Sequence, residues 1–265
     1  MSALLQLRDV GVRFGAVTAL GGVSFEVDEG SLFGLIGPNG AGKTTLIDAV
    51  SGFLPQATGD VLFASERLNK LPAHRRAHRG LIRTFQSLEL FEDLTVRENL
   101  LVAAEPQTWL TSIVDLVRPG RESPVEAVEH ALEVVGLSHA ATRMPSELSN
   151  GQRKLVAVAR ALASQARLVM LDEPAAGLDT RESRELGAHL RAVVDSGVTM
   201  LLIDHDMGLV LGICDRVHVL DFGVTIAEGT PAEIRADSRV ISAYLGESDD
   251  SDGDSRALDR GESLT

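Results

Sequence analysis

Residues 37 to 45 read GPNGAGKTT, in which glycines, one lysine and two threonines have the spacing of a phosphate-binding loop. The glycines allow the backbone to curl until successive N–H groups face one anion, at the positive end of the helix that follows. An apolar strand at 31–36 precedes the loop and a helical run at 44–50 follows it, which is the context that this motif requires. The candidate phosphate contacts are Gly37, Pro38, Asn39, Gly40, Ala41, Gly42, Lys43, Thr44 and Thr45.

Two side chains of this loop have separate chemical tasks. Lys43 is long enough to reach the β- and γ-phosphates of a nucleotide, while the Thr44 hydroxyl is placed to bind Mg²⁺, with Thr45 beside it. A glycine turn with a merely solvated lysine is the simpler alternative, but the flanking strand and helix disfavour it. The loop therefore predicts a nucleotide site that uses Mg²⁺.

An acid pair follows a second apolar strand, in RLVMLDEP at 167–174. Consecutive residues at the end of a strand point in different directions. Asp172 can therefore hold the Mg²⁺ shell while Glu173 faces a water molecule, orients it and takes its proton. Taken alone, two solvated acids in a turn explain the run equally well. Together with the phosphate loop, the pair predicts hydrolysis of a nucleoside triphosphate.

The run LSNGQRKLVAVARAL at 148–162 predicts a second helix start that faces an anion. Ser149 caps the helix with Gln152 three residues on, Gly151 frees the backbone, and Asn150 tolerates left-handed dihedral angles. One nucleotide has one γ-phosphate, which the phosphate loop already holds. A second anion-facing helix start therefore suggests a nucleotide bound by another copy of the chain. On this motif alone, an ordinary capped helix remains the favoured interpretation.

The elements that must position these residues alternate between strand and helix. Apolar runs predict strands at about 31–36, 167–171, 198–203 and 215–220. This alternation predicts an α/β fold with a largely parallel, buried sheet. Capping-box patterns predict helix starts at Thr95, Ser123, Ser149 and Thr230. The chain between about 89 and 162 is mostly helical in pattern and predicts a helical subdomain inserted into the lobe that holds the sheet.

The composition is that of an ordinary globular protein, with 44% hydrophobic and 24% charged residues in 265. A net charge of −13 disfavours a nucleic-acid backbone as a partner. The single cysteine, Cys214, excludes an internal disulfide and lies in an apolar run, which favours a buried thiol in a reducing compartment. The apolar runs are far shorter than the ~20 residues of a membrane span. We therefore expect a soluble or peripheral protein, with an acidic tail at 247–265 that has too little apolar surface to fold.

Five motifs in order carry a family resemblance: GPNGAGKTT, RTFQ (83–86), LSNGQ (148–152), LVMLDEPAAGLD (168–179) and LLIDHD (201–206). Residues 1 to about 246 resemble the ATP-binding cassette of ABC transporters. The resemblance implies an ABC-type P-loop NTPase fold, with a RecA-like sheet lobe, an antiparallel β edge and the inserted helical subdomain. It also implies that two cassettes close head to tail on two MgATP. The signature-like residues 149–152 of one subunit then face the nucleotide of the other, which explains the second helix start.

The same resemblance assigns roles to four further positions. Phe14 matches the aromatic residue that stacks on adenine, and Gln86 matches the glutamine that senses Mg²⁺ and faces the membrane partner. Asp179 matches an acid that acts across the dimer interface, and His205 the switch histidine at the γ-phosphate. Each position also has a simpler explanation: Phe14 as a core ring, Gln86 as a surface amide, Asp179 as a helix cap and His205 as a loop histidine. The candidate catalytic residues are Lys43, Gln86, Glu173 and His205, and the candidate metal ligands are Thr44, Gln86 and Asp172.

The sequence departs from the family pattern at two positions. Asn150 stands where a glycine is usual, and Phe14 replaces the commoner tyrosine, which keeps the aromatic face and loses the hydroxyl. We expect neither change to abolish activity.

Longer stretches, among them LIRTFQSLELFEDLTVRENLLVAA and the ending AEGTPAEIRADSRVISAYLG, are similar to bacterial ATP-binding subunits of branched-chain amino acid importers. Cassettes for urea uptake and lipopolysaccharide export share much of this sequence, including the short ending. The resemblance implies a peripheral location at the cytoplasmic face of the bacterial plasma membrane. The partners it implies are a second cassette, identical or related, two separate transmembrane permease subunits and, indirectly, a solute-binding protein.

Two rival classes fit the sequence less well. ABC-type ATPases of DNA repair, chromosome organisation or translation need coiled-coil arms, zinc insertions or tandem cassettes, and the sequence has none of these patterns. A P-loop kinase for a small molecule would not need LSNGQ. The basic segment HRRAHRG at 74–80 is expected to be a solvated helix face rather than a metal or nucleic-acid site. The apolar run around Trp109 is expected to pack within the helical subdomain.

Overall fold

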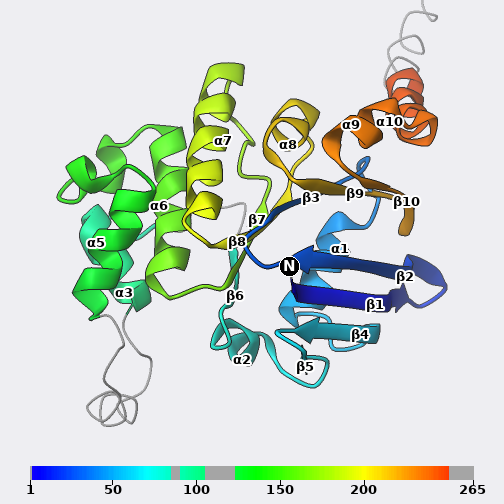
Figure 1. Ribbon diagram of the computed structural model, residues 1–265, viewed down its shortest axis with the longest axis horizontal. Helices are drawn as coiled ribbons and strands as arrows, with labels where there is room; N and C mark the ends of the chain where they lie inside the picture. Colours follow the sequence, from blue (N-terminus) through cyan, green and yellow to red (C-terminus); the bar gives the residue numbers. More distant parts are fainter. Residues whose placement is uncertain (1, 85–89, 105–122, 251–265) are drawn as a thin grey trace, which may run out of the picture.

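The computed structural model describes residues 2–84, 90–104 and 123–250. These residues contain a six-stranded sheet in the order β10-β9-β3-β8-β7-β6, in which β10 alone is antiparallel to its neighbour (Figure 1). Its strands are β3 (Leu32–Ile36), β6 (Leu81–Thr84), β7 (Leu168–Asp172), β8 (Thr199–Ile203), β9 (Arg216–Asp221) and β10 (Val224–Gly229). The α/β fold and the four strands predicted from apolar runs are confirmed, as β3, β7, β8 and β9.

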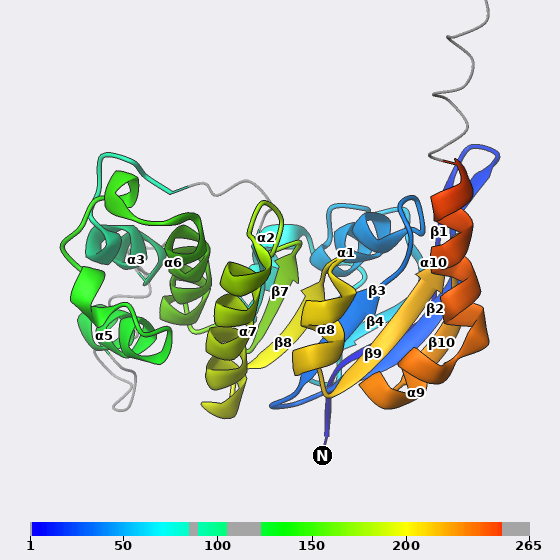
Figure 2. The same cartoon turned by 90° about the horizontal axis from the view of Figure 1, so that it is seen from above.

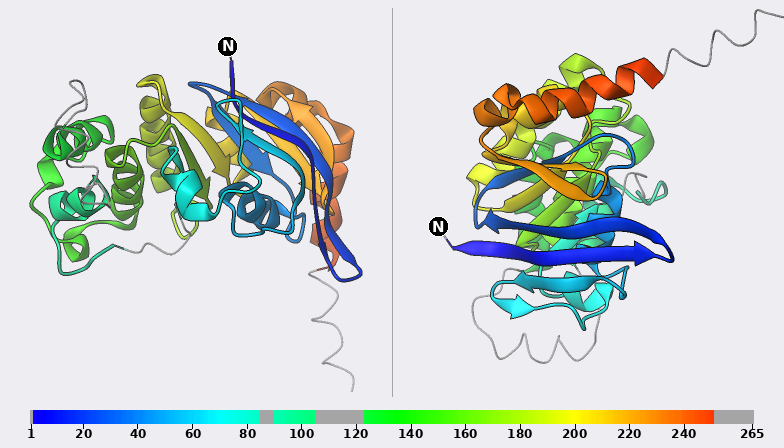
Figure 3. Two further views of the ribbon diagram at one scale, coloured as in Figure 1. Left: turned by 90° about the horizontal axis from the view of Figure 1, so that it is seen from below. Right: turned by 90° about the vertical axis from the view of Figure 1, so that its right-hand side faces the viewer.

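A second, antiparallel sheet of the described residues has the order β2-β1-β4-β5 and lies along one side of the molecule (Figure 3). Its strands are β1 (Ala3–Phe14), β2 (Val17–Asp28), β4 (Thr58–Phe63) and β5 (Glu66–Arg67). One apolar core joins this sheet to α1 (Lys43–Ser51) and to the central sheet. Within that core, Phe25 of β2 stacks on Phe33 of β3 with ring centroids 5.1 Å apart. This sheet is the antiparallel β edge that the resemblance implies.

The chain leaves the central sheet after β6 and returns at β7, and the described elements between them are all helical. They are α3 (Val96–Ala104), α5 (Pro124–Val134), the 3₁₀ turns η1 (Ser138–Ala140) and η2 (Pro145–Glu147), and α6 (Asn150–Ala163). Helices α3, α5 and α6 pack on one another at one end of the molecule (Figure 2). Buried residues such as Leu100, Leu132 and Val156 form their shared core. Trp109 and its apolar run lie outside the described residues.

The remaining helices are α2 (Ala73–Ala77), α7 (Thr180–Asp195), α8 (Met207–Ile213), α9 (Pro231–Ala236) and α10 (Ser238–Asp250). The bounds of helix α10 include residues 247–250, the first four residues of the acidic tail. Once a helix has been nucleated, each further residue adds one hydrogen bond at little cost, which extends it past its apolar residues. Residues 251–265 lie outside the described part. No helix of the described residues is long and apolar enough to cross a membrane.

The predicted helix starts are confirmed by their hydrogen bonds. Ser123, Ser149 and Thr230 each form a complete capping box, in which the hydroxyl accepts from the third residue on and that residue's side chain accepts from the cap's N–H. Thr95 and Glu98 make the same reciprocal pair before α3. Local sequence therefore fixes where these four helices begin.

The basic segment 74–80 differs from the expected solvated face at one residue. Arg76 is buried, and its guanidinium donates to the carbonyl oxygens of Leu71 at 2.9 Å, Ala49 at 2.9 Å and Val50 at 2.7 Å. Ala49 and Val50 belong to the last turn of α1, whose carbonyls have no partner within the helix. Arg76 therefore satisfies the end of α1, and burial lowers its pKa.

Candidate active site

The phosphate loop connects the end of β3 to the start of α1, as its sequence predicts (Figure 1). Gly37 has a φ of 155°, and a Cβ there would lie 2.2 Å from the carbonyl oxygen of Leu220, so only glycine fits. Gly42 is the N-cap residue of α1 with a left-handed φ of 101°. The turn between β9 and β10 supports the loop from outside, since the Gly223 N–H donates to the Ala41 carbonyl at 2.9 Å. The curled backbone of an anion cradle is thus held by neighbouring strands.

Lys43 already places its charge inside this loop. Its side chain is buried, and Nζ donates to the carbonyl oxygen of Gly37 at 2.6 Å and to that of Pro38 at 2.9 Å. Thr44 and Asn39 beside it are exposed. A phosphate seated in the loop would therefore lie close to the ammonium group, and would offer it a charged acceptor in place of neutral carbonyls.

The acid pair reaches two different neighbours, as the alternation of a strand predicts. Asp172 ends β7, and its Oδ2 accepts from Nη2 of Arg83 at 2.8 Å. Glu173 has Oε2 3.7 Å from Nδ1 of His205, beyond the end of the adjacent strand β8. Glu173 also has a φ of 49°, in the left-handed region that side chains rarely adopt, and its N–H donates to the Ile203 carbonyl at 2.7 Å. Backbone strain of this kind is concentrated at functional sites.

Asp204 holds the loops around Glu173 and His205, and sequence reasoning missed it. Its side chain is fully buried, and Oδ2 accepts from the Ala175 N–H at 2.9 Å while Oδ1 accepts from the Asp206 N–H at 3.0 Å. Nδ1 of His205 lies 3.6 Å from Oδ1 of the same carboxylate. The signal that could have found it is an acid placed directly after the all-apolar strand TMLLI. A carboxylate beside a buried strand must be hydrogen-bonded if it is buried, because an unpaired buried charge is costly.

Lys154 of α6 adds a charge near this buried carboxylate. Burial lowers the pKa of the Lys154 ammonium, while the negative charge of Asp204 acts in the opposite direction and favours the charged form. Lys154 is two residues beyond Gln152, in the helix that starts at the signature-like motif. The pair therefore connects that helix electrostatically to the loop that follows β8.

The signature-like residues are not brought to the phosphate loop of their own chain. In Figures 1 and 2, helix α6 lies on the far side of strands β7 and β8 from α1. Ser149 is exposed, and its hydroxyl accepts from the Gln152 N–H at 3.3 Å while Gln152 Oε1 accepts from the Ser149 N–H at 3.1 Å. Asn150 is also exposed and Gly151 half-buried. An accessible helix start that its own nucleotide loop does not use is the arrangement that the dimer hypothesis requires.

The remaining candidates have mixed outcomes. Phe14 is 49% exposed at the end of β1, so it is not the core ring of the simpler explanation, and its contact with adenine stays a prediction. Asp179 is the N-cap of α7, where Oδ1 accepts from the N–H groups of Arg181 and Glu182, both at 2.8 Å. The helix-cap explanation of Asp179 is therefore correct, and it leaves a role across an interface untested. Gln86 lies outside the described residues.

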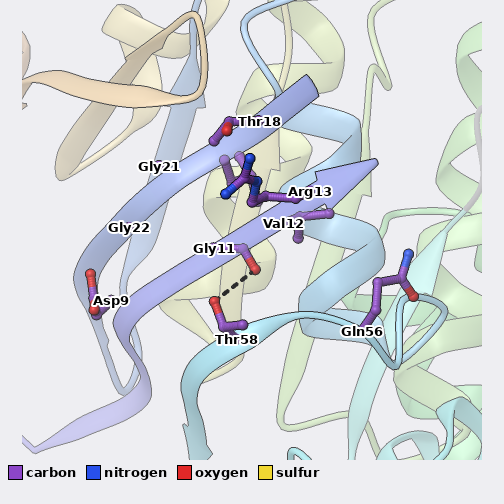
Figure 4. Close-up of a pocket in the computed structure, with 10 residues that line it drawn as sticks. Asp9, Gly11, Val12, Arg13, Thr18, Gly21, Gly22, Gln56 and Thr58 are labelled. Atoms are coloured by element: carbon purple, nitrogen blue, oxygen red, sulfur yellow. Dashed lines mark hydrogen bonds between the residues drawn. The ribbon is translucent and has the colours of Figure 1, made fainter. Parts of the chain in front are cut away.

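A separate hollow of about 370 Å³ lies on the antiparallel sheet (Figure 4). Gly11, Gly21 and Gly22 line it, and the Thr58 hydroxyl of β4 donates to the Gly11 carbonyl of the neighbouring strand β1 at 3.2 Å. Arg13 and Thr18 also line it, next to the hairpin that carries Phe14, but no residue of the phosphate loop does. The hollow is therefore distinct from the phosphate site.

The carboxylate oxygens of Asp172 and the hydroxyl oxygen of Thr44 suit Mg²⁺, which prefers oxygen ligands. In the part of the chain that the structure describes, no three or more His, Cys, Asp or Glu side chains are grouped to hold a metal ion. Mg²⁺ in nucleotide sites commonly takes one or two protein oxygens and completes its shell with phosphate oxygens and water. A carboxylate, a hydroxyl and a nearby phosphate loop fit that pattern.

Comparisons with known proteins agree with this geometry. Residues 20–176 match the family model described as ABC transporter, and residues 224–250 match the one described as branched-chain amino acid ATP-binding cassette transporter. The high-affinity branched-chain amino acid transport ATP-binding protein LivG of Salmonella typhimurium is 42% identical over 250 residues, 92% of this chain and 98% of that protein. The lipopolysaccharide export system ATP-binding protein LptB of Escherichia coli is 34% identical over 225 residues, 85% and 90% of the two chains.

A solved structure shares the fold over nearly the whole chain. The crystal structure of an ATP-binding cassette of an ABC transporter in its ADP conformation superposes with a TM-score of 0.81 at 34% identity. The match covers 93% of this chain and 100% of that one. This chain therefore belongs to the ABC transporter family, and it is an ATP-hydrolysing, nucleotide-binding subunit of that family.

Proposed function

We propose that this protein powers the import of branched-chain or similar amino acids by hydrolysing ATP for separate membrane permease subunits. The observation that carries this proposal is the match of residues 224–250 to the branched-chain amino acid model. These residues form β10, α9 and α10, which lie beyond every nucleotide motif. The higher identity to LivG than to LptB supports the same assignment over the whole chain.

The phosphate loop and Lys43 gather positive charge at the β- and γ-phosphates of ATP. Thr44, Asp172 and Gln86 would hold Mg²⁺, which would supply positive charge to neutralise the phosphate oxygens. Glu173 orients the attacking water and takes its proton. His205 contacts the γ-phosphate in this proposal, which its position 3.7 Å from the Glu173 carboxylate supports.

A second cassette completes the site. Ser149 and Gly151 of one subunit donate to the γ-phosphate held by the other, so the closed dimer contains ligand contacts that the open one lacks. Only such differential contacts can drive closure, and hydrolysis removes them. Phe14 stacks on the adenine, and Asp179 lies at the subunit interface. The exposure of the α6 start, away from its own phosphate loop, supports this arrangement.

The assembled importer places this subunit at the cytoplasmic face of the bacterial plasma membrane. Two permease subunits contact it near Gln86, and a solute-binding protein delivers the amino acid to them from the other side. The second cassette is a copy of this chain or a related one. Nucleic acid is not a partner, in keeping with the net charge of −13.

Affinity purification of the tagged, full chain from detergent-solubilised native membranes tests the assignment, with mass spectrometry of the retained proteins. We expect two different multi-span permeases and a second, related cassette. Uptake of labelled leucine, but not of urea, should then depend on the gene. Recovery of export-bridge proteins instead, or of no membrane subunit, would move lipopolysaccharide export or a role outside transport ahead of amino acid import.

A further inference from the structure

Arg83 joins two acids that belong to different elements around the phosphate loop. It lies on β6, and its guanidinium donates through Nη2 to Oδ2 of Asp172 at 2.8 Å and through Nη1 to Oδ1 of Asp48. The side chains of Arg83 and Asp172 are only 9% and 13% exposed. Charged groups so far from water interact more strongly than surface pairs, and losing one partner leaves the other without compensation.

The two acids belong to the two elements that carry the proposed metal ligands Asp172 and Thr44. Asp172 ends β7, and Asp48 is in the second turn of α1, the helix that begins with Lys43 and Thr44. Strands β6 and β7 run parallel with Arg83 opposite Met170, so the guanidinium reaches forward along the sheet to the end of β7. A planar guanidinium presents its donors in a fixed fork, which sets the direction as well as the distance of each carboxylate.

We propose that Arg83 is a positioning residue for the Mg²⁺ site. It holds Oδ2 of Asp172, which leaves Oδ1 for the metal, and through Asp48 it fixes Asp172 relative to the helix that carries Thr44. This inference rests on the proposed function, because it takes Asp172 as the acid that holds Mg²⁺. Partners that orient metal ligands in this way commonly change metal affinity about 10- to 100-fold when they are removed.

A purely structural role is the competing explanation, in which Arg83 only fastens α1 to the central sheet. The two roles differ in what they do to nucleotide binding without metal. A loosened α1 would weaken the phosphate loop itself, so that ATP affinity falls equally with Mg²⁺ and with EDTA. A mispositioned Asp172 would weaken binding only where Mg²⁺ takes part.

The test compares Arg83→Gln and Arg83→Lys with Arg79→Gln, all in the full chain. Arg79 is the matched control, since its Nε pairs with the exposed Glu66 at 2.9 Å on the surface before β6. A fluorescent, non-hydrolysable ATP analogue is titrated with Mg²⁺ and with EDTA, and the Mg²⁺ concentration for half-maximal binding is measured. We expect Arg83→Gln to raise that concentration about 10- to 100-fold and to keep the affinity in EDTA. Arg83→Lys should raise it less, and Arg79→Gln should leave it unchanged.

An unchanged Mg²⁺ requirement in Arg83→Gln, or equal losses with Mg²⁺ and with EDTA, would overturn the inference. Circular dichroism reports whether the variants fold. If Arg83→Gln does not, Asp48→Asn and Arg83→Lys provide the same comparison, because each keeps a charge beside Asp172 and loses part of the bridge. A normal Mg²⁺ requirement in both would then overturn the inference. An unmodified chain that binds no nucleotide in either buffer would overturn the proposed function, and the inference with it.

Discussion

At the scale of single residues, two groups of the candidate site occupy positions that cost folding free energy. Glu173 has a φ of 49° at the end of a buried strand, and its carboxylate lies 3.7 Å from His205. Lys43 is buried with two neutral carbonyls as hydrogen-bond acceptors. A left-handed backbone and a buried ammonium group both cost folding free energy, so we interpret both as features kept for the reaction.

Replacing Glu173 by Gln should separate binding from turnover. The amide keeps the size of the side chain but cannot take a proton, so the ATPase rate should fall about 10²- to 10⁴-fold. ATP affinity should stay the same, and a closed dimer should accumulate in the presence of MgATP. Phosphate release and size-exclusion chromatography measure the two effects, with Glu185→Gln on the exposed face of α7 as the control. Normal turnover in Glu173→Gln would remove this residue from its role.

Replacing Lys43 by Ala should act on binding itself. The change removes a charge-assisted hydrogen bond, which contributes about 1.5–3 kcal/mol, so nucleotide affinity should fall about 10- to 100-fold. Equilibrium titration with a fluorescent ATP analogue measures this, and Lys70→Ala, outside the loop, is the control. Unaltered affinity would contradict the assignment of the phosphate loop.

At the scale of elements, buried polar side chains tie the ends of strands and helices together. Arg76 closes the end of α1, and Asp204 joins the segment after β7 to the segment after β8. Each of these groups supplies hydrogen bonds to backbone atoms at the end of a strand or helix, where regular secondary structure leaves them incompletely bonded. The loops of the site are therefore held in place by the same bonds that complete the secondary structure.

Asp204→Asn should reduce stability without changing side-chain size. An amide has one oxygen to accept from N–H groups, so the variant leaves either the Ala175 or the Asp206 N–H without its acceptor. A buried donor that loses its partner costs about 1–3 kcal/mol of unfolding free energy. Urea unfolding measures the change, and Asp195→Asn on the surface of α7 should be nearly neutral. Equal stability of the two variants would show that Asp204 does not hold these loops.

At the scale of the whole molecule, the two halves of the proposed nucleotide site do not meet within one chain. The phosphate loop and the acid pair lie at the ends of the parallel strands, while the start of α6 belongs to the helical end of the molecule (Figure 2). A second copy turned head to tail brings the two halves together twice, and the closed pair has two sites. Symmetric dimers are the commonest way in which proteins complete such interfaces.

A mixing experiment tests whether the two halves come from different subunits. Lys43→Ala damages the phosphate loop, and Gly151→Asp places a carboxylate where the partner's γ-phosphate is expected. A Cβ at Gly151 would meet only the Ser149 hydroxyl oxygen at 4.0 Å, so this variant should fold. Each variant alone should be inactive. In an equal mixture half of the dimers are mixed and have one intact site, which predicts about a quarter of normal ATPase activity. A mixture no more active than its parts would contradict the composite site.

Much of this protein is determined by local sequence. The phosphate loop, the apolar strands and the four capping boxes can be predicted because the interactions that define them span few residues. The cap at Ser149 involves only Gln152, three residues on, whereas the glycine at position 37 follows from the loop motif but is required in the fold by the distant Leu220 carbonyl. The acid pair is equally local, since it follows directly from a strand that ends at Asp172.

Other features were decided only by the tertiary structure. The bridge from Arg83 joins residues 35 and 89 positions away in the chain, and Asp204 bonds a residue 29 positions away. Arg76 looks like a solvated base in sequence and is buried because α2 packs against the end of α1. Such contacts depend on how the sheet orders its strands, and strand order is set by packing of the whole core rather than by any local pattern. The sequence motifs predicted the candidate site residues, and the tertiary structure determined which buried charged side chains contact them.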